Sequence, residues 1–121
     1  LTLPWPPTVN NHWRSVIVDG RVRVLISEAG RIYRGDVLAA FLHSRTTKAP
    51  AGRLSLAIVL HPPDRRKRDI DNCLKALLDA LTHAGVYEDD SLIDHITLTR
   101  GTIVKGGQVV VGIFLWNPSF V

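Results

Sequence analysis

The sequence predicts an α/β (α+β) fold, a single domain in which a mixed β-sheet with hairpins is packed by two main helices. Apolar residues recur at helical spacing in segments 27–44 and 69–85, and they alternate with period two in several shorter runs. The length of 121 residues, of which 45% are hydrophobic, suits one core. With a single cysteine, Cys73, no internal disulfide can form. Residues 1–121 are therefore expected to form one domain.

The N-terminal part is predicted to hold an edge strand, a hairpin and a helix. Residues 1–7 include three prolines, which a sheet accepts at its edges, and a polar loop is expected at Asn10-Asn11. The pair Asp19-Gly20 between valine-rich runs predicts a hairpin over 16–25 with a type I′ turn. Ser27 and the following glutamate open an amphipathic helix that runs to about residue 44.

The C-terminal part is predicted to hold three strands and the second helix. Residues 53–60 alternate leucine and isoleucine with smaller side chains, which indicates a strand after the loop 46–52. The second helix is expected from Asp69 to Gly85. Strands at 96–104 and 109–115, joined by a Gly-Gly turn, are expected to form another hairpin. The last strand is apolar almost throughout, which is typical of a strand covered on both faces, inside the monomer or by a partner.

The charge of the chain is compatible with nucleic-acid binding. Lysine and arginine total 15 against 11 acids, a net charge of +4, which solubility alone could also explain. Four cations stand in one run, and they are candidates for phosphate contact or for a solvated loop: Arg65, Arg66, Lys67 and Arg68. Three polar residues near the N-terminus could contact DNA or cap turns: Asn10, Asn11 and Arg14. Trp5 and Trp13 could stack on a ligand or pack within the protein.

Acidic residues bracket the second predicted helix. Asp69 and Asp71 stand at its start, where one aspartate could serve as a cap, and Glu88, Asp89 and Asp90 follow its end. If Asp90 lay about 4 Å from the first two, each pair would repel by about 4 kcal/mol at an effective dielectric of 20. A raised pKa or a hard cation would relieve this, and carboxylates without paired Cys or His favour Mg²⁺ over zinc. Spacing leaves open whether Asp90 lies near the helix start or at its far end.

Lys75 lies four residues after Asp71 and four before Asp79. It could form an ordinary surface ion pair on a helix, or it could place its ammonium beside a phosphate. The five histidines show no metal-ligand spacing, and no glycine-rich phosphate loop is present. We therefore expect the histidines to be structural or exposed and the protein to use no nucleotide cofactor.

The ordered motif from Pro63 to Asn72, followed by Lys75, by 79–85 and by Asp89-Asp90, resembles the signature of RusA-type Holliday-junction resolvases. The resemblance extends to Leu3–Pro7 and to Lys105–Gly107. It implies a crossover junction endodeoxyribonuclease that makes paired symmetric nicks in four-way DNA junctions during recombination and repair. It also implies a homodimer, whose two-fold symmetry would supply two equivalent sites.

The same resemblance assigns the site. It makes Asp69, Asp71, Lys75 and Asp90 catalytic, with Mg²⁺ (or Mn²⁺ in its place) held by the three aspartates. It leaves open whether the neighbouring Asp89 shares the role of Asp90. No apolar run approaches the length of a membrane span, and the single cysteine fits a reducing compartment, so a soluble, cytoplasmic protein is expected. Two alternatives remain: a non-catalytic basic DNA-binding module whose acids cap helices, and a metal-dependent nuclease for other branched DNA.

Overall fold

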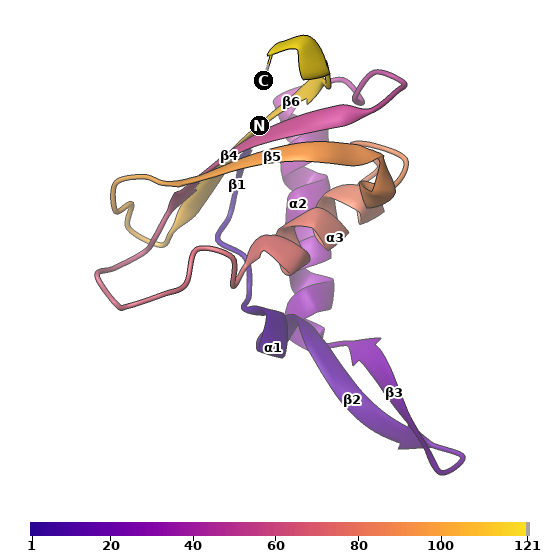
Figure 1. Cartoon of the computed structure of the whole chain (residues 1–121). Helices are drawn as coiled ribbons and strands as arrows, with labels where there is room; N and C mark the ends of the chain where they lie inside the picture. Colours follow the sequence, from indigo (N-terminus) through magenta and orange to yellow (C-terminus); the bar gives the residue numbers. More distant parts are fainter. Residues whose placement is uncertain (121) are drawn as a thin grey trace.

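The computed structural model describes residues 1–120. Its central unit is a four-stranded sheet with the two long helices on one side, and a two-stranded hairpin projects away from this body (Figure 1). None of the helices in the described range is long and apolar enough to cross a membrane. In chain order the elements are β1 (Thr2–Leu3), α1 (Val9–His12), β2 (Trp13–Val18), β3 (Arg21–Ile26), α2 (Glu28–Ser44), β4 (Leu54–His61), α3 (Leu74–His83), η1 (Asp90–Leu92), β5 (Ile93–Arg100), β6 (Gln108–Leu115) and η2 (Pro118–Phe120).

The sheet has the order β1-β6-β4-β5, with β4 antiparallel to β6 and parallel to β5. Strand β1 is at an edge, as its prolines predicted. The prediction of a hairpin between the last two strands was wrong, because β4 lies between them. The connection 101–107 crosses the end of β4, where Gly101 N–H bonds to Leu60 O and Val104 N–H to Pro62 O. These bonds carry the chain past β4 before β6 begins.

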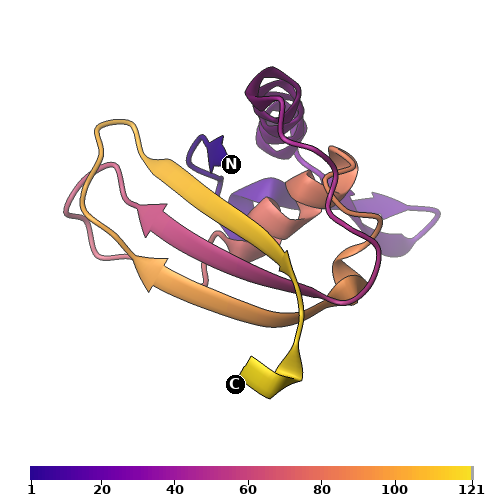
Figure 2. The same ribbon diagram turned by 90° about the horizontal axis from the view of Figure 1, so that it is seen from above.

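The core lies between the sheet and the helices. Alternate residues of β4 are buried, as the period of two predicted, and they pack with the apolar faces of α2 and α3. Figure 2 shows that α2 and α3 lie on the same face of the sheet. Residues that define this core are Leu54, Leu56, Ile58, Leu60, Val37, Leu77 and Leu81. This packing fixes the direction of α3 relative to the strands.

The predicted hairpin and first helix are confirmed. Asp19 and Gly20 have φ of 52° and 74°, the positive values that a type I′ turn requires. Ser27 caps α2 by accepting a hydrogen bond from Gly30 N–H at 3.0 Å. The polar loop expected at Asn10-Asn11 is instead the short helix α1. Its backbone is held by bonds from the amides of Asn11 and His12 to Thr8 O.

The second helix is shorter than predicted. It begins at Leu74 rather than Asp69, because residues 69–73 form successive turns, in which Asn72 N–H bonds to Asp69 O and Leu74 N–H to Asp71 O. Its end agrees with the prediction. Gly85, at φ 76°, reverses the chain and donates to Thr82 O. The segment 69–73, called the acidic turn below, is therefore a separate structure at the N-terminus of α3.

Candidate active site

The acidic turn presents two exposed carboxylates. Asp69 and Asp71 both lie on the surface, and within residues 1–120 neither side chain forms an ion pair or a hydrogen bond. Neither caps α3, whose N-cap residue is Cys73 and whose first turn has no side-chain cap bond. A capping role therefore does not account for these two aspartates. Two solvated carboxylates in one turn are instead available to an external cation.

Helix α1 lies against the acidic turn. The amide of Val9 donates to Asn72 O at 3.0 Å, and α1 meets α3 near its N-terminal end (Figure 1). The predicted DNA-binding residues Asn10 and Asn11 are exposed on this helix. The fold thus places them beside Asp69 and Asp71, although 58 or more residues separate them in the chain. Arg14, also exposed, follows on β2.

Residues 62–68, called the basic loop below, contain the four cations and lead from β4 into the acidic turn. Within it, Arg68 bonds to Asp64 at 2.7 Å, and Arg66 lies 3.8 Å from the same carboxylate. The hydrogen bond from Arg68 is the main reason that the pKa of Asp64 falls to about 2. Arg65 and Lys67 are exposed and make no ion pair within the described residues. The four cations therefore divide into two that are held by Asp64 and two that are free.

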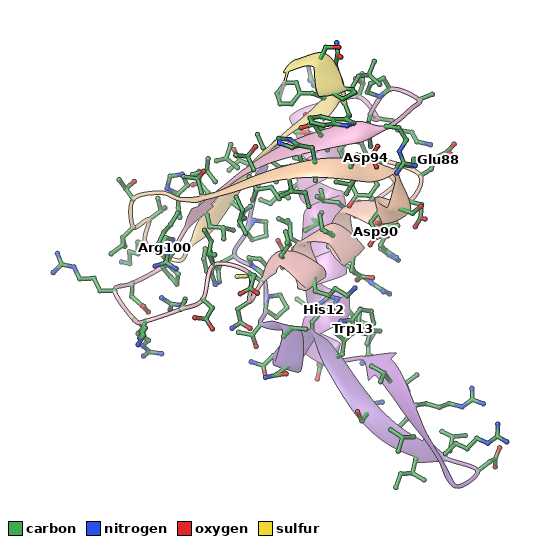
Figure 3. All side chains as sticks on the ribbon, viewed as in Figure 1. His12, Trp13, Glu88, Asp90, Asp94 and Arg100 are labelled. Atoms are coloured by element: carbon green, nitrogen blue, oxygen red, sulfur yellow. The ribbon has the colours of Figure 1, made fainter. Side chains whose placement is uncertain are left out.

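A cleft of about 260 Å³ opens between this loop and the end of the sheet. Arg100, at the end of β5, donates to Arg68 O at 2.6 Å and so holds the loop against the sheet (Figure 3). Sequence reasoning missed Arg100, and its only sequence signal is a lone cation at a strand end. Trp5 packs within the protein here, against Gly107, and lies 6.0 Å from the Arg68 guanidinium. The cleft is lined by residues of the basic loop together with Trp5, Leu60, Asp69, Cys73, Arg100 and Ile103.

Asp90 lies at the end of the sheet opposite the basic loop. Strand β5 starts beside the first residue of β4, since Ile93 pairs with Leu54. The basic loop leaves β4 after His61, seven residues later and about 23 Å further along the strand. Figure 3 shows Asp90 grouped with Glu88 and Asp94, far from Arg100. In residues 1–120, no three His, Cys, Asp or Glu side chains are placed to hold one metal ion.

The predicted metal ligands thus fit Mg²⁺ in chemistry but not as a set within one chain. Carboxylate oxygens are the donors that a hard cation prefers. The fold brings Asp69 and Asp71 together and leaves Asp90 apart, exposed at the start of η1. Its neighbour Asp89 accepts a hydrogen bond from Ser91 Oγ, which lowers the pKa of Asp89. Of these two, Asp90 has the freer side chain.

Lys75 does not form the ion pair that its spacing from Asp79 allows. Asp79 instead accepts from His12 Nε2 at 2.9 Å and from two nitrogens of Arg34 at 2.8 and 2.9 Å. Lys75 is exposed in the first turn of α3, immediately after the acidic turn, and pairs with no acid in the part of the chain that is described. Its ammonium is therefore free to meet a phosphate near Asp71.

Sequence reasoning also missed the support beneath the site. His12, Arg34 and Asp79 join α1, α2 and α3, and His12 is fully buried. The Nδ1 atom of His12 has no partner among residues 1–120, so this ring is held through Nε2. Cys73, the last residue of the acidic turn, is buried, and burial raises the pKa of its thiol. This keeps the thiol in its neutral, unreactive form.

Known proteins of similar sequence identify the family of this chain. The family model described as Endodeoxyribonuclease RusA matches residues 4–113. The chain is 39% identical over 111 residues to the crossover junction endodeoxyribonuclease of Enterobacteria phage HK97, covering 92% of this chain and 89% of that one. It is 36% identical over 109 residues to the enzyme of the same name from Escherichia coli K12, covering 90% and 88%. Spanning nearly the whole sequence, these matches show that the chain belongs to the RusA family of endodeoxyribonucleases.

Proposed function

We propose that this protein is a Holliday-junction resolvase, a magnesium-dependent endodeoxyribonuclease that makes paired symmetric nicks in four-way DNA junctions. The observation that carries the proposal is the acidic turn, where Asp69 and Asp71 stand unpaired between α1 and a basic loop. The relatives named crossover junction endodeoxyribonucleases support the choice of substrate. A role in recombination and repair, in the cytoplasm, follows from that substrate.

The chain's own residues suggest how the DNA strand is held. Arg65 and Lys67 offer free cations to phosphates on one side of the acidic turn, and Asn10 and Asn11 offer amide donors on the other. A phosphate above the turn would meet Lys75, whose ammonium offsets the negative charge that builds up during hydrolysis. A divalent ion, when bound, lowers the pKa of water and polarises the phosphate. Asp69 and Asp71 would hold that ion from within one chain.

We infer from the position of Asp90 that the third predicted metal ligand comes from a second copy of the chain. Asp90 precedes β5, which starts beside the first residue of β4, whereas the basic loop leaves the other end of β4, about 23 Å along that strand. In a two-fold dimer, Asp90 of one subunit can complete the site of the other, and symmetry then repeats the arrangement. We therefore propose a homodimer with two composite sites, one for each strand to be cut.

The test is cleavage of a labelled four-way junction, a flap and a plain duplex, each with Mg²⁺, with Mn²⁺ or with chelator. We expect metal-dependent nicks at symmetric positions of the junction only. Asp71→Asn should bind the junction and leave it intact. Binding without cleavage in either metal would instead identify a non-catalytic DNA-binding module. Preferential cleavage of flaps would identify a nuclease for other branched DNA.

A further inference from the structure

The hairpin β2–β3 projects from the body (Figure 1). Its register divides its side chains between two faces. Cross-strand partners share a face, and alternate pairs point to opposite sides. One face holds the pairs Arg14–Leu25, Val16–Arg23 and Val18–Arg21, and the other holds Trp13–Ile26, Ser15–Val24 and Ile17–Val22. Every arginine of the hairpin therefore lies on the first face, which we call the basic face.

The arginines of the basic face have no partner in the protein. Arg14, Arg21 and Arg23 are exposed and form no ion pair or side-chain hydrogen bond within residues 1–120. By contrast, Arg34, on α2, donates two hydrogen bonds to Asp79 in a bidentate ion pair. The only acid of the hairpin is Asp19, in its turn. Three like charges that stabilise nothing within the fold are suited to a polyanion outside it.

The hairpin is connected to the acidic turn through α1. Strand β2 starts at Trp13 directly after α1, which is bonded to Asn72 through Val9. The basic loop enters the same turn from the sheet side. Asp69 and Asp71 therefore lie between two groups of free cations. A strand cleaved at the turn continues in both directions, so its phosphates can reach both groups.

We propose that the hairpin is a DNA-binding arm, whose basic face holds the phosphate backbone of a duplex branch away from the cleavage point. A two-stranded ribbon has the dimensions that the major groove admits, and its arginines can also follow the backbone beside the groove. This inference rests on the proposed function, because it gives the arm a branch of the same substrate. It adds Arg21 and Arg23 to the predicted contact at Arg14.

Contacts to phosphates have a specific signature. Each lost contact reduces the slope of log K against log salt by about 0.9, and it weakens binding on the order of tenfold near 0.1 M salt. Arg21→Gln with Arg23→Gln removes two contacts from each subunit, so it should flatten the slope by up to about 1.8 for each arm that binds DNA. The double variant Arg21→Lys with Arg23→Lys keeps both charges and should retain the slope.

A matched control is available at the far end of α2. Arg45 and Lys48 are exposed cations without an acidic partner in the described chain, about 25 Å from the hairpin along the 17-residue helix. Asparagine at position 45 suits the left-handed backbone there, at φ 58°. The double variant Arg45→Asn with Lys48→Gln therefore removes as many positive charges as the arm variant does. We expect the control to retain nearly the whole salt slope.

The experiment measures fluorescence anisotropy of a labelled four-way junction and of a linear duplex in chelator, from 50 to 300 mM NaCl. Selective weakening by the arm variant, with recovery in the lysine variant, is the expected result. An arm variant that binds like the wild type or like the control would overturn the proposal. If the wild type binds junctions but cleaves none, the nuclease function fails, while the salt slopes still decide the role of the arm.

Discussion

The carboxylate of Asp79 lies 2.9 Å from Nε2 of His12 and accepts two hydrogen bonds from the Arg34 guanidinium, so one side chain joins three helices. Through His12 it fixes α1, and α1 in turn contacts the acidic turn through Val9 and Asn72. The site therefore depends on a partly buried network about two helical turns from its carboxylates.

Asp79→Asn should lower the free energy of unfolding by about 2 kcal/mol, because it leaves a buried histidine and a half-buried arginine without their anion. Urea denaturation measures this change. Asp94→Asn is a suitable control, since Asp94 pairs with Arg53 at an exposed position where solvent screens the pair and its contribution to stability is small. Equal losses in the two variants would contradict a special role for Asp79.

The same network predicts an acid-sensitive contribution to stability. Burial of Asp79 opposes its ionisation, but the bonds from Arg34 and His12 outweigh burial and hold its pKa below the ordinary 3.8. The stability from a lowered carboxyl pKa is fully present above the unfolded value and is lost as pH falls through the folded one. The difference between wild type and Asp79→Asn should therefore shrink below about pH 4. Urea titrations from pH 7 to pH 3 measure it, and a gap that widens with acid would refute this account.

The composite dimer predicts complementation between inactive variants. Asp71→Asn and Asp90→Asn should each be inactive as homodimers. In a mixed dimer with shared sites, one site carries both substitutions and the other carries none. Refolding the two variants together should thus restore nicking of one strand per dimer.

If instead each site were built within a single chain, every site in the mixture would remain damaged and no activity would return. Mixing Asp71→Asn with Asp69→Asn is the matched control. These residues share one turn, so both sites of that mixed dimer stay defective and no activity should appear.

Lys75→Ala should reduce single-turnover cleavage by on the order of 10²-fold, the usual effect of losing one group that stabilises charge in a transition state. The free energy of unfolding should change by less than about 0.5 kcal/mol, because Lys75 is exposed and unpaired within residues 1–120. Rapid-quench cleavage and urea denaturation separate the two effects. A loss of stability without a loss of rate would return Lys75 to a structural role.

Patterns confined to neighbouring residues predicted the fold best. The type I′ turn at Asp19-Gly20, the cap at Ser27 and the alternation in β4 each depend on local geometry, and all are confirmed. The proposed pairing of the last two strands was wrong because Gly101 and Val104 bond to the end of β4. Those bonds link residues about 40 positions apart, which no local pattern encodes.

The candidate site shows the same difference between local patterns, which the sequence reveals, and long-range packing, which it does not. Sequence identified the acids beside the basic run. Helical spacing also allowed an ion pair between Lys75 and Asp79, but in the fold Asp79 bonds to Arg34 and His12. The position of Asp90, at the end of the sheet opposite the basic loop, is set by the register of β5 on β4. Both outcomes depend on packing between distant segments, so they became visible only in three dimensions.

The hairpin meets the body chiefly at its root, where the ring of His12 contacts Trp13 edge to face and Ile26 packs against Gly30. Its length is thus almost independent of the core. Because neighbouring residues of a strand point to opposite sides, one inserted residue would exchange the two faces, whereas two per strand would preserve them. Each such step would move the tip outward by about 6.6 Å. Evolution or design can therefore adjust the reach of this arm in fixed increments without altering the enzyme beneath it.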